Sequence, residues 1–163
     1  MSLTTPRTGL TPRLFYRTLA IAEAVTWTLL IAGMLLKYAA GIDTPFGFAA
    51  GLAHGFVFIA YAATAVLVGI NQRWGFPLIA GAVATAIVPY ATVPFDRWLE
   101  RTGRLEGSWR TEKSDDPRDR TVIDGLVRWM LRRPILLGTV FVIAVVGVVA
   151  GMLVAGPPSE WGA

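Results

Sequence analysis

Two residues of this sequence could carry protons or bind a ligand inside otherwise apolar stretches. Glu23 is the only carboxylate well within a hydrophobic run, and His54 is the only histidine of the chain. An acidic side chain at the centre of a membrane span costs about 2.5–3.5 kcal/mol on insertion scales, so Glu23 is expected to face protein rather than lipid. Imidazole and carboxyl groups can relay protons, and imidazole can also ligate a haem iron.

The spacing of the apolar runs predicts which residues lie level with Glu23. A helical hairpin that folds about residue 42 places Glu23 opposite Tyr61, and a second reversal near residues 73–74 brings Thr85 to the same depth. The sequence therefore predicts a buried, hydrogen-bonded layer of Glu23, Tyr61 and Thr85. The functional alternative is a carboxylate that handles protons or cations.

The same argument places His54 opposite Leu30, too far from Glu23 for direct contact. Three interpretations of His54 stay open. It is a neutral histidine bonded to a backbone carbonyl, Thr26 or Trp27, or a proton relay with Tyr61 and Glu23, or a haem ligand.

Small residues recur at helical spacing in two apolar runs. Gly47, Gly51 and Gly55 lie four residues apart, and Gly147 and Gly151 repeat the spacing. Glycine lets a neighbouring helix backbone approach closely, so these faces predict helix packing, within the chain or against a partner.

Another stripe repeats at three- and four-residue steps along the first apolar run. It is interpreted as a packing face with candidate buried polar positions at Trp27 and Lys37; its members are Glu23, Trp27, Leu30, Met34 and Lys37.

Composition decides the class of protein. Hydrophobic residues make up 54% of the 163, and the mean hydropathy is +0.54, which indicates an integral membrane protein. The absence of cysteine excludes disulfides and thiolate sites, and a single histidine excludes a multi-histidine metal site within one chain. Nucleophile, HExxH and phosphate-loop patterns are also missing. We therefore expect no enzyme activity, no metal and no cofactor.

The runs predict an all-α polytopic membrane protein with four transmembrane helices. The predicted spans are 18–36, 46–70, 76–95 and 134–155, with Pro89 and Pro94 kinking the third. A signal peptide is the rival interpretation of the first run, which is longer than a usual signal core. The predicted organisation is a polar lead-in over 1–16, a three-helix membrane domain over 17–98, a basic connection over 99–133, a fourth helix over 134–156 and a tail over 157–163.

The connection is predicted to be partly disordered, most clearly over 111–120. Thr121 and Asp124 resemble a capping box that opens an amphipathic helix over about 121–132. Its arginines, Arg128 and Arg132, together with Arg133, are expected to contact anionic lipid headgroups. The bilayer explains the basic character of the chain, and no nucleic-acid partner is expected.

Charge distribution predicts the orientation. With four crossings, the termini share one side with four basic residues, and the other side holds eleven. The positive-inside rule then places the connection in the cytoplasm and both termini outside the cell membrane.

Several motif points in order resemble a bacterial membrane family. The first run reads R-x-x-A-x-x-E-A, then a tryptophan, then M-x-L-K-Y; the second reads G-x-x-H-G-x-x-F-x-x-Y; the third ends in P-F-D-R-W-L-E. These residues are Arg17, Ala20, Glu23, Ala24, Trp27, Met34, Leu36, Lys37, Tyr38, Gly51, His54, Gly55, Phe58, Tyr61 and the stretch 94–100. Over about 13–100 the chain resembles the family called domain of unknown function 3817. The resemblance implies an integral-membrane fold and no assigned activity.

The function that these features favour is a non-catalytic accessory or scaffold subunit that packs with other membrane proteins or with itself. The first alternative is a small oligomeric transporter or channel with a polar path through Glu23, Tyr61 and His54. The second is a haem or redox-cofactor binder centred on His54.

Overall fold

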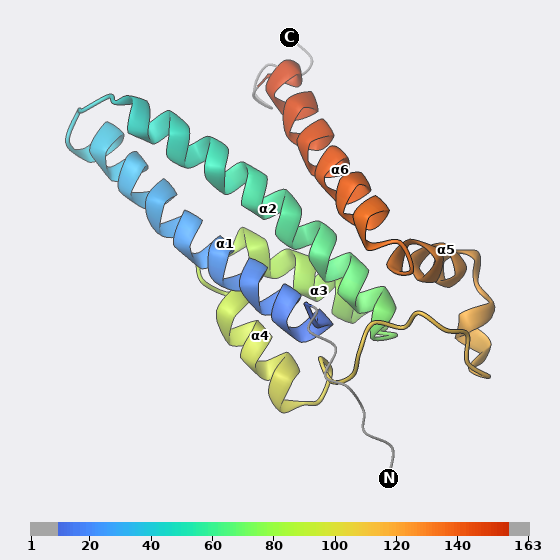
Figure 1. Cartoon of the computed structure of the whole chain (residues 1–163). Coiled ribbons are helices and arrows are strands. Elements are labelled where there is room, and N and C mark those ends of the chain that lie inside the picture. The colour runs from blue at the N-terminus through green and yellow to red at the C-terminus, as the bar shows by residue number, and fades with distance from the viewer. Residues whose placement is uncertain (1–9, 157–163) are drawn as a thin grey trace.

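The computed structural model of the chain describes residues 10–156, and within these residues the fold is entirely helical (Figure 1). Its α-helices are α1 (Pro12–Met34), α2 (Pro45–Asn71), α3 (Phe76–Ala84), α4 (Thr92–Arg101), α5 (Val122–Leu131) and α6 (Pro134–Ala155). Three short segments accompany them: a π-helical turn η1 (Leu35–Ala39) and two 3-10 turns, η2 (Thr85–Ile87) and η3 (Pro117–Arg120). The predicted lead-in over 1–16 lies partly, and the tail over 157–163 wholly, outside the described residues.

Three helices are long and apolar enough to cross a membrane: Pro12–Ala39, Pro45–Asn71 and Pro134–Ala155. The first two form the antiparallel hairpin that the sequence predicts, and α6 runs beside α2 (Figure 1). A proline stands in the first turn of each of these spans, where its missing N–H group costs no hydrogen bond. The all-α membrane fold is confirmed.

The predicted fourth crossing, over 76–95, is wrong. Helix α3 ends at Ala84, and after η2 the chain becomes extended at Val88, directly before Pro89. Proline lacks an N–H group and disfavours a helical residue before it, so the helix cannot continue through this point. Tyr90 then adopts a positive φ of 65°, which reverses the chain into α4. We call Phe76–Arg101 the re-entrant hairpin.

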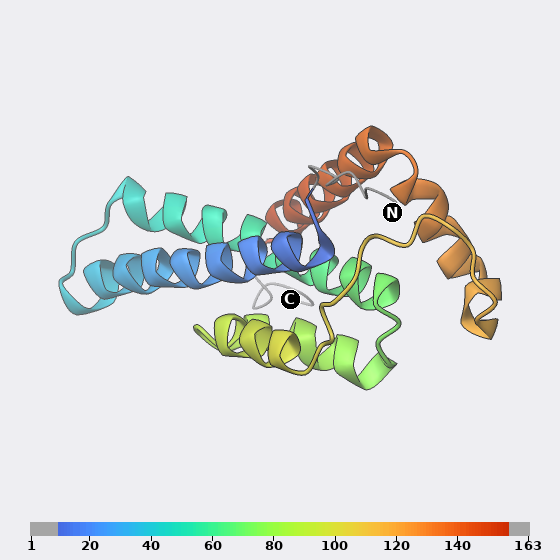
Figure 2. The same ribbon diagram turned by 60° about the horizontal axis from the view of Figure 1, so that its bottom comes forward.

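Two contacts show that α4 returns toward the end from which α3 started. The Trp27 indole donates to the Ala86 carbonyl (3.1 Å), and the Thr92 hydroxyl donates to the Ala20 carbonyl (2.9 Å). Ala86 therefore lies level with Trp27, about 22 Å along α1 from its start at 1.5 Å per residue. Helix α3 packs against α2 and helix α4 packs against α1, and Figure 2 shows both on one side of the α1–α2 pair. The span Pro12–Ala39 has 28 residues and is therefore about 42 Å long, so the tip of the hairpin reaches about the middle of this span before the chain turns back.

With three candidate spans in place of the four predicted crossings, the start of α1 and the end of α6 lie at opposite ends of the molecule. The Trp109 indole, in the connection, donates to the Leu10 carbonyl (2.6 Å), so the start of α1 lies beside the connection. Helix α6 leads away from that end and finishes near the other (Figure 1). The prediction that both termini lie opposite the connection is wrong, because it counted the re-entrant hairpin as a full crossing.

The best-packed part of the molecule lies where α1 and α2 meet the re-entrant hairpin. Nine hydrophobic residues are buried together there: Tyr16, Ala20, Tyr61, Ala65, Val68, Ala82, Ala86, Leu99 and Leu105. In contrast, Val145 is the only buried residue among those of α6. The compact unit is therefore the hairpin pair with its re-entrant segment, and α6 lies on its edge.

The connection is more ordered than its composition suggests. Asp119, which lies in the stretch predicted to be solvated, is buried and accepts hydrogen bonds from the Ser114 amide (2.8 Å) and hydroxyl (2.7 Å). Three guanidinium groups surround the same carboxylate: Arg73 (2.9 Å), Arg110 (2.5 Å) and Arg128 (3.3 Å). These five residues are called the Asp119 cluster. The two hydrogen bonds from Ser114, followed by Arg73, hold the pKa of Asp119 far below its usual range.

Arg110 also closes the end of α2. Its guanidinium donates to the carbonyls of Ile70 (2.7 Å) and Asn71, and its amide donates to the Asn71 side chain (2.8 Å). The last carbonyls of a helix have no partner within the helix and form the negative end of its dipole, so a cation stabilises them. The connection is thereby fixed to the helical bundle through residues that lie far apart in the sequence.

Candidate functional site

Glu23 is fully buried where α1 meets α2, and neither of its carboxylate oxygens accepts a hydrogen bond within the described residues. The nearest cationic candidate is His54, whose Nδ1 lies 3.7 Å from Glu23 Oε2. This distance is too long for a hydrogen bond but short enough for direct electrostatic contact. The two residues that could carry protons therefore face each other, which the prediction from symmetry about residue 42 had excluded.

Three neighbours hold the imidazole of His54. The Thr26 hydroxyl lies 3.2 Å from Nδ1, the Trp27 ring stacks at 4.5 Å between centroids, and the Phe58 ring lies at 6.2 Å. Trp27 is itself fixed through its bond to Ala86 on the re-entrant hairpin. The Glu23–His54 pair is thus enclosed by α1, α2 and the tip of the hairpin, and both side chains are positioned by packing.

A second polar group lies about two helical turns nearer the connection. The hydroxyls of Tyr16 and Tyr61 are 2.6 Å apart, and Tyr61 lies 2.9 Å from the Thr85 hydroxyl. Thr85 donates its proton to the Ala82 carbonyl (2.6 Å), so Tyr61 must donate to Thr85, and Tyr16 must donate to Tyr61. The chain of donors ends at a backbone carbonyl and ties α1, α2 and α3 together.

This layer corrects the predicted trio of Glu23, Tyr61 and Thr85, because Tyr16 occupies the place expected for Glu23. The reason is the register of the hairpin. Folding about residue 42 places Lys37 opposite Gly47, but the structure places Gly33 there, so close that a Cβ atom added to Gly33 would lie only 3.1 Å from the Gly47 Cα. A symmetric hairpin would pair residues 35–39 with the start of α2, but the structure places them in the π-helical turn. The residues of α1 that face α2 are therefore shifted by one to two helical turns.

The remaining candidate residues of α1 and the glycines lie apart from the polar groups. Lys37 forms an exposed ion pair with Asp43 (3.3 Å) at the loop between α1 and α2. Gly47 contacts Gly33, whereas a Cβ added to Gly51 or Gly55 would meet no atom within 4 Å. The same is true of Gly147 and Gly151 in α6. Most of the predicted packing glycines therefore face open space in this single chain.

The three arginines predicted to bind headgroups have different environments. Arg128 is buried and donates to the Asp119 carbonyl (2.6 Å), so its assignment as a lipid contact is wrong: the connection folds over it. Arg132 donates to the Thr111 carbonyl (2.7 Å), and Arg133 stacks on Trp129 at 4.4 Å. Both remain exposed at the start of α6.

Sequence reasoning missed the ion pairs that fix the re-entrant hairpin. Arg17 donates to Asp96 (3.1 Å) and to Glu100, and Arg13 also pairs with Glu100. Asp96 is almost fully buried. The available signal was an aspartate and a glutamate four residues apart after a proline, which places both on one face of a short helix.

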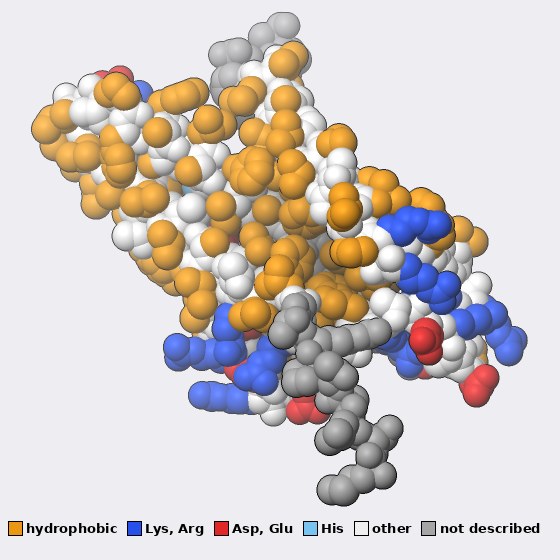
Figure 3. Space-filling model, viewed as in Figure 1, with side chains coloured by type: hydrophobic (Ala, Val, Ile, Leu, Met, Phe, Trp, Pro, Cys, Tyr) orange, Lys and Arg blue, Asp and Glu red, His pale blue; other side chains and the backbone are white. Residues whose placement is uncertain are grey.

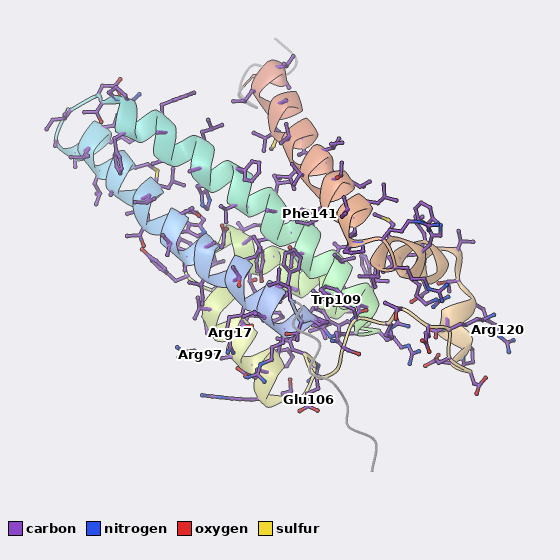
Figure 4. All side chains as sticks on the ribbon, in the orientation of Figure 1. Arg17, Arg97, Glu106, Trp109, Arg120 and Phe141 are labelled. Atoms are coloured by element: carbon purple, nitrogen blue, oxygen red, sulfur yellow. The ribbon has the colours of Figure 1, made fainter. Side chains whose placement is uncertain are left out.

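The described residues offer little for a metal or cofactor. They contain no group of three or more histidine, aspartate or glutamate side chains that could hold a metal ion. The His54 ring is enclosed between aromatic side chains, which leaves the haem interpretation without a supporting observation. The chemistry that the Glu23–His54 pair can supply is the holding or exchange of a proton between a carboxyl group and an imidazole. Figure 4 shows the side chains on all helices of the described structure.

Fold and site together define an all-helical integral membrane protein with three candidate spans and a shorter apolar helix in the re-entrant hairpin. The family model of the domain of unknown function 3817 matches residues 14–101, so the chain belongs to this family. The resemblance inferred from the motifs is confirmed. The matched range comprises α1, α2 and the re-entrant hairpin, and leaves out the connection and α6.

A protein of Streptomyces coelicolor, whose name records only an expected membrane location, is 43% identical over 90 residues. These residues are 53% of this chain and 10% of that protein, so the chain matches about a tenth of the length of this relative. No solved structure matches the chain.

Proposed function

We propose that this protein is a non-catalytic accessory subunit whose membrane helices pack against a helix of another membrane protein. The observation that carries the proposal is a cleft of about 460 Å³ between α2 and α6. Gly47, Gly51 and Gly55 line one wall, and Met152 and Leu153 lie on the other. Phe48 and Leu52 also line the α2 wall, but the glycine stripe between them carries no side chains, so a helix backbone can approach it closely and gain van der Waals contact that lipid would not supply.

Two further facts support a helix as the occupant. Helix α6 contributes one buried residue to the described structure, so the chain alone leaves this span weakly held. In the Streptomyces relative, the matching region is a small part of a much longer chain, which is typical of a module that works beside other segments. Packing between copies of this chain is the other outcome that the purification experiment distinguishes.

The proposed orientation follows from the three crossings. Lys37 is the only Lys or Arg from residue 18 to residue 72, and none follows Arg133. The other basic residues belong to the N-terminal lead-in, the start of α1, the 71–75 turn, α4 and the connection. Figure 3 shows basic side chains gathered at this end, below the apolar surface. By the positive-inside rule, this end faces the cytoplasm of a bacterial cell membrane.

The test is purification of the full chain in mild detergent, with the mass of the complex and its copurifying proteins measured together. The wild type is expected to retain a stoichiometric partner. The double variant Gly51→Leu/Gly55→Leu fills the cleft and is expected to lose it. Gly81→Leu is the matched control, because Gly81 also has open space around its Cβ but lies on α3, away from the cleft. A wild-type chain that purifies alone would contradict the proposal.

A second candidate function, proton handling at the Glu23–His54 pair, is favoured by one observation. A carboxylate that is fully buried and accepts no hydrogen bond is costly to keep, so its retention calls for a role beyond packing. The test is proton flux into liposomes that contain the protein. Glu23→Gln is expected to abolish the flux, and Tyr16→Phe, outside the pair, is expected to preserve it. Equal flux in wild type and Glu23→Gln would remove this candidate.

A further inference from the structure

A cleft on the outer side of the α1–α4 contact combines charge at one end with apolar walls at the other. It has a volume of about 520 Å³ and is lined by Arg17, Asp96, Arg97, Glu100 and Arg101, with Ile21 and Val93 beside them. Figure 4 places Arg17 and Arg97 on the same side of the bundle, over α1 and α4. The cleft lies at the end of the molecule where basic side chains gather (Figure 3).

The acidic residues of this cleft are already neutralised. Asp96 pairs with Arg17, and Glu100 pairs with both Arg17 and Arg13. These carboxylates are therefore not available to balance further positive charge. What remains in the lining is the charge of Arg97 and Arg101.

Arg97 and Arg101 lie four residues apart, on one face of α4, and both are exposed. Within residues 10–156, neither forms an ion pair or a side-chain hydrogen bond, unlike Arg104, which lies over the Trp98 ring at 4.7 Å. Two guanidinium groups from residues one helical turn apart, both lining the cleft, match the charge of a phosphate, which guanidinium can bind through paired N–H groups.

The apolar part of the cleft lies deeper in the membrane. Ile21 is one helical turn further along α1 than Arg17, and it is 49% exposed; Val93 is one turn before Arg97 on α4. Trp98, 42% exposed on the same helix, is a residue type that prefers the membrane–water interface. The polarity of the cleft therefore changes along the bilayer normal, from cationic at the interface to apolar inside.

We infer that this cleft binds one anionic phospholipid, with its phosphate on Arg97 and Arg101 and an acyl chain along Ile21 and Val93. The charge pattern selects a headgroup with net negative charge, and the apolar wall distinguishes a lipid from free phosphate. This site replaces Arg128, which the fold buries, as the principal headgroup contact of the chain. The inference does not depend on the proposed partner helix, because the two clefts share no residue.

The experiment is native mass spectrometry of the full chain in detergent, titrated with phosphatidylglycerol or with phosphatidylcholine. The wild type is expected to bind one phosphatidylglycerol in clear preference to phosphatidylcholine. The double variant Arg97→Gln/Arg101→Gln is expected to bind it at least about tenfold more weakly, since each interfacial arginine contributes measurably to anionic-lipid affinity. Arg97→Lys/Arg101→Lys keeps the charge and is expected to retain most of the binding.

The matched control is Lys113→Gln/Arg120→Gln, which removes the same charge from exposed positions of the connection, outside the cleft. Its phosphatidylglycerol affinity is expected to equal that of the wild type. Equal weakening by both double variants would overturn the inference, because it would show a diffuse charge effect. Equal binding of phosphatidylcholine, or unchanged binding by the Arg97/Arg101 variant, would overturn it too.

Competition separates a lipid site from a phosphate site. Inorganic phosphate at millimolar concentration is expected to leave the bound phosphatidylglycerol in place, and Ile21→Asn is expected to weaken lipid binding by removing part of the apolar wall. If inorganic phosphate displaces the lipid and Ile21→Asn binds the lipid as the wild type does, the site is one for free phosphate. This result would overturn the inference of a lipid site.

Discussion

The Asp119 cluster and the Glu23–His54 pair both centre on a buried carboxylate, but the two are satisfied to very different extents. Asp119 accepts two hydrogen bonds from Ser114 and faces three guanidinium groups. Glu23 accepts none from residues 10–156 and has one imidazole 3.7 Å away. The first carboxylate has a structural role, because its partners fold the connection. Within the described residues, the second carboxylate holds no element in place through a hydrogen bond, which is why the proton-handling proposal centres on it.

The largest effect that this comparison predicts is at Asp119. Asp119→Asn leaves three buried or half-buried guanidinium groups without their shared charge, so the connection should open. Cleavage by trypsin after the Arg and Lys residues of 104–120 is expected to accelerate by about tenfold or more. Asp115→Asn, at an exposed neighbour, is the control and should leave the rate unchanged. Similar rates in both variants would mean that the cluster does not hold the connection.

Acid should act on the same cluster, with a sign that follows from the lowered pKa of Asp119. A depressed pKa contributes stability above the unfolded-state value, near 3.9, and this stability is lost as the pH falls further toward the folded-state value. Hydrogen exchange of the connection, corrected for intrinsic rates, should therefore show constant protection from about pH 7 to about pH 4 and a decline below. A loss of protection between about pH 7 and about pH 5 would assign the behaviour to a different group.

A smaller effect is expected in the tyrosine layer beside the pair. Tyr61→Phe removes the acceptor of Tyr16 and the donor to Thr85, and should cost about 1–2 kcal/mol of unfolding free energy. Tyr16→Phe should cost about half as much, because Tyr61 keeps its bond to Thr85. Equilibrium unfolding in mixed micelles measures both values. The opposite order would contradict the donor direction assigned from Thr85.

The smallest effect is expected at Glu23 itself. Glu23→Gln removes no hydrogen bond, so the unfolding free energy should change by about 1 kcal/mol or less. The same micelle experiment measures it, with Thr26→Val, which loses the contact with His54, as the reference. A cost above that of Tyr61→Phe would show that Glu23 has a structural partner, and the contrast with Asp119 would disappear.

Local sequence signals predicted the features that depend on nearby residues. Long apolar runs predicted the spans α1, α2 and α6, and the Thr121–Asp124 pattern predicted α5, whose first turn is capped as expected (3.2 Å). These signals suffice because helix length and capping are decided within a few residues. The motif resemblance over about 13–100 likewise agrees with the matched family range.

Features set by distant contacts were not predictable in this way. Pro89 indicated a kink. Whether the chain only bends there or reverses depends on the ion pair that Arg17 forms with Asp96, 79 residues further along the chain. Whether Glu23 and His54 lie opposite each other depends on the register of the α1–α2 hairpin, which is set by the number of residues in the turn near Lys37. Asp119 looks solvated within its own stretch, because its partner Arg73 lies 46 residues away. Each failure concerns a polar group whose partner is remote in the chain.

The bonds from Arg110 to the end of α2 also set an order of events during synthesis. Arg110 leaves the ribosome 39 residues after Asn71, so α2 and the re-entrant hairpin are already made while the last carbonyls of α2 lack this partner. The hairpin can therefore enter the bilayer beside an open helix end. When Arg110 arrives, it closes that end and fixes the connection across it. The segment that looks like a linker is thus made after the α1–α2 pair and the re-entrant hairpin, and it closes the end of α2 before α6 follows.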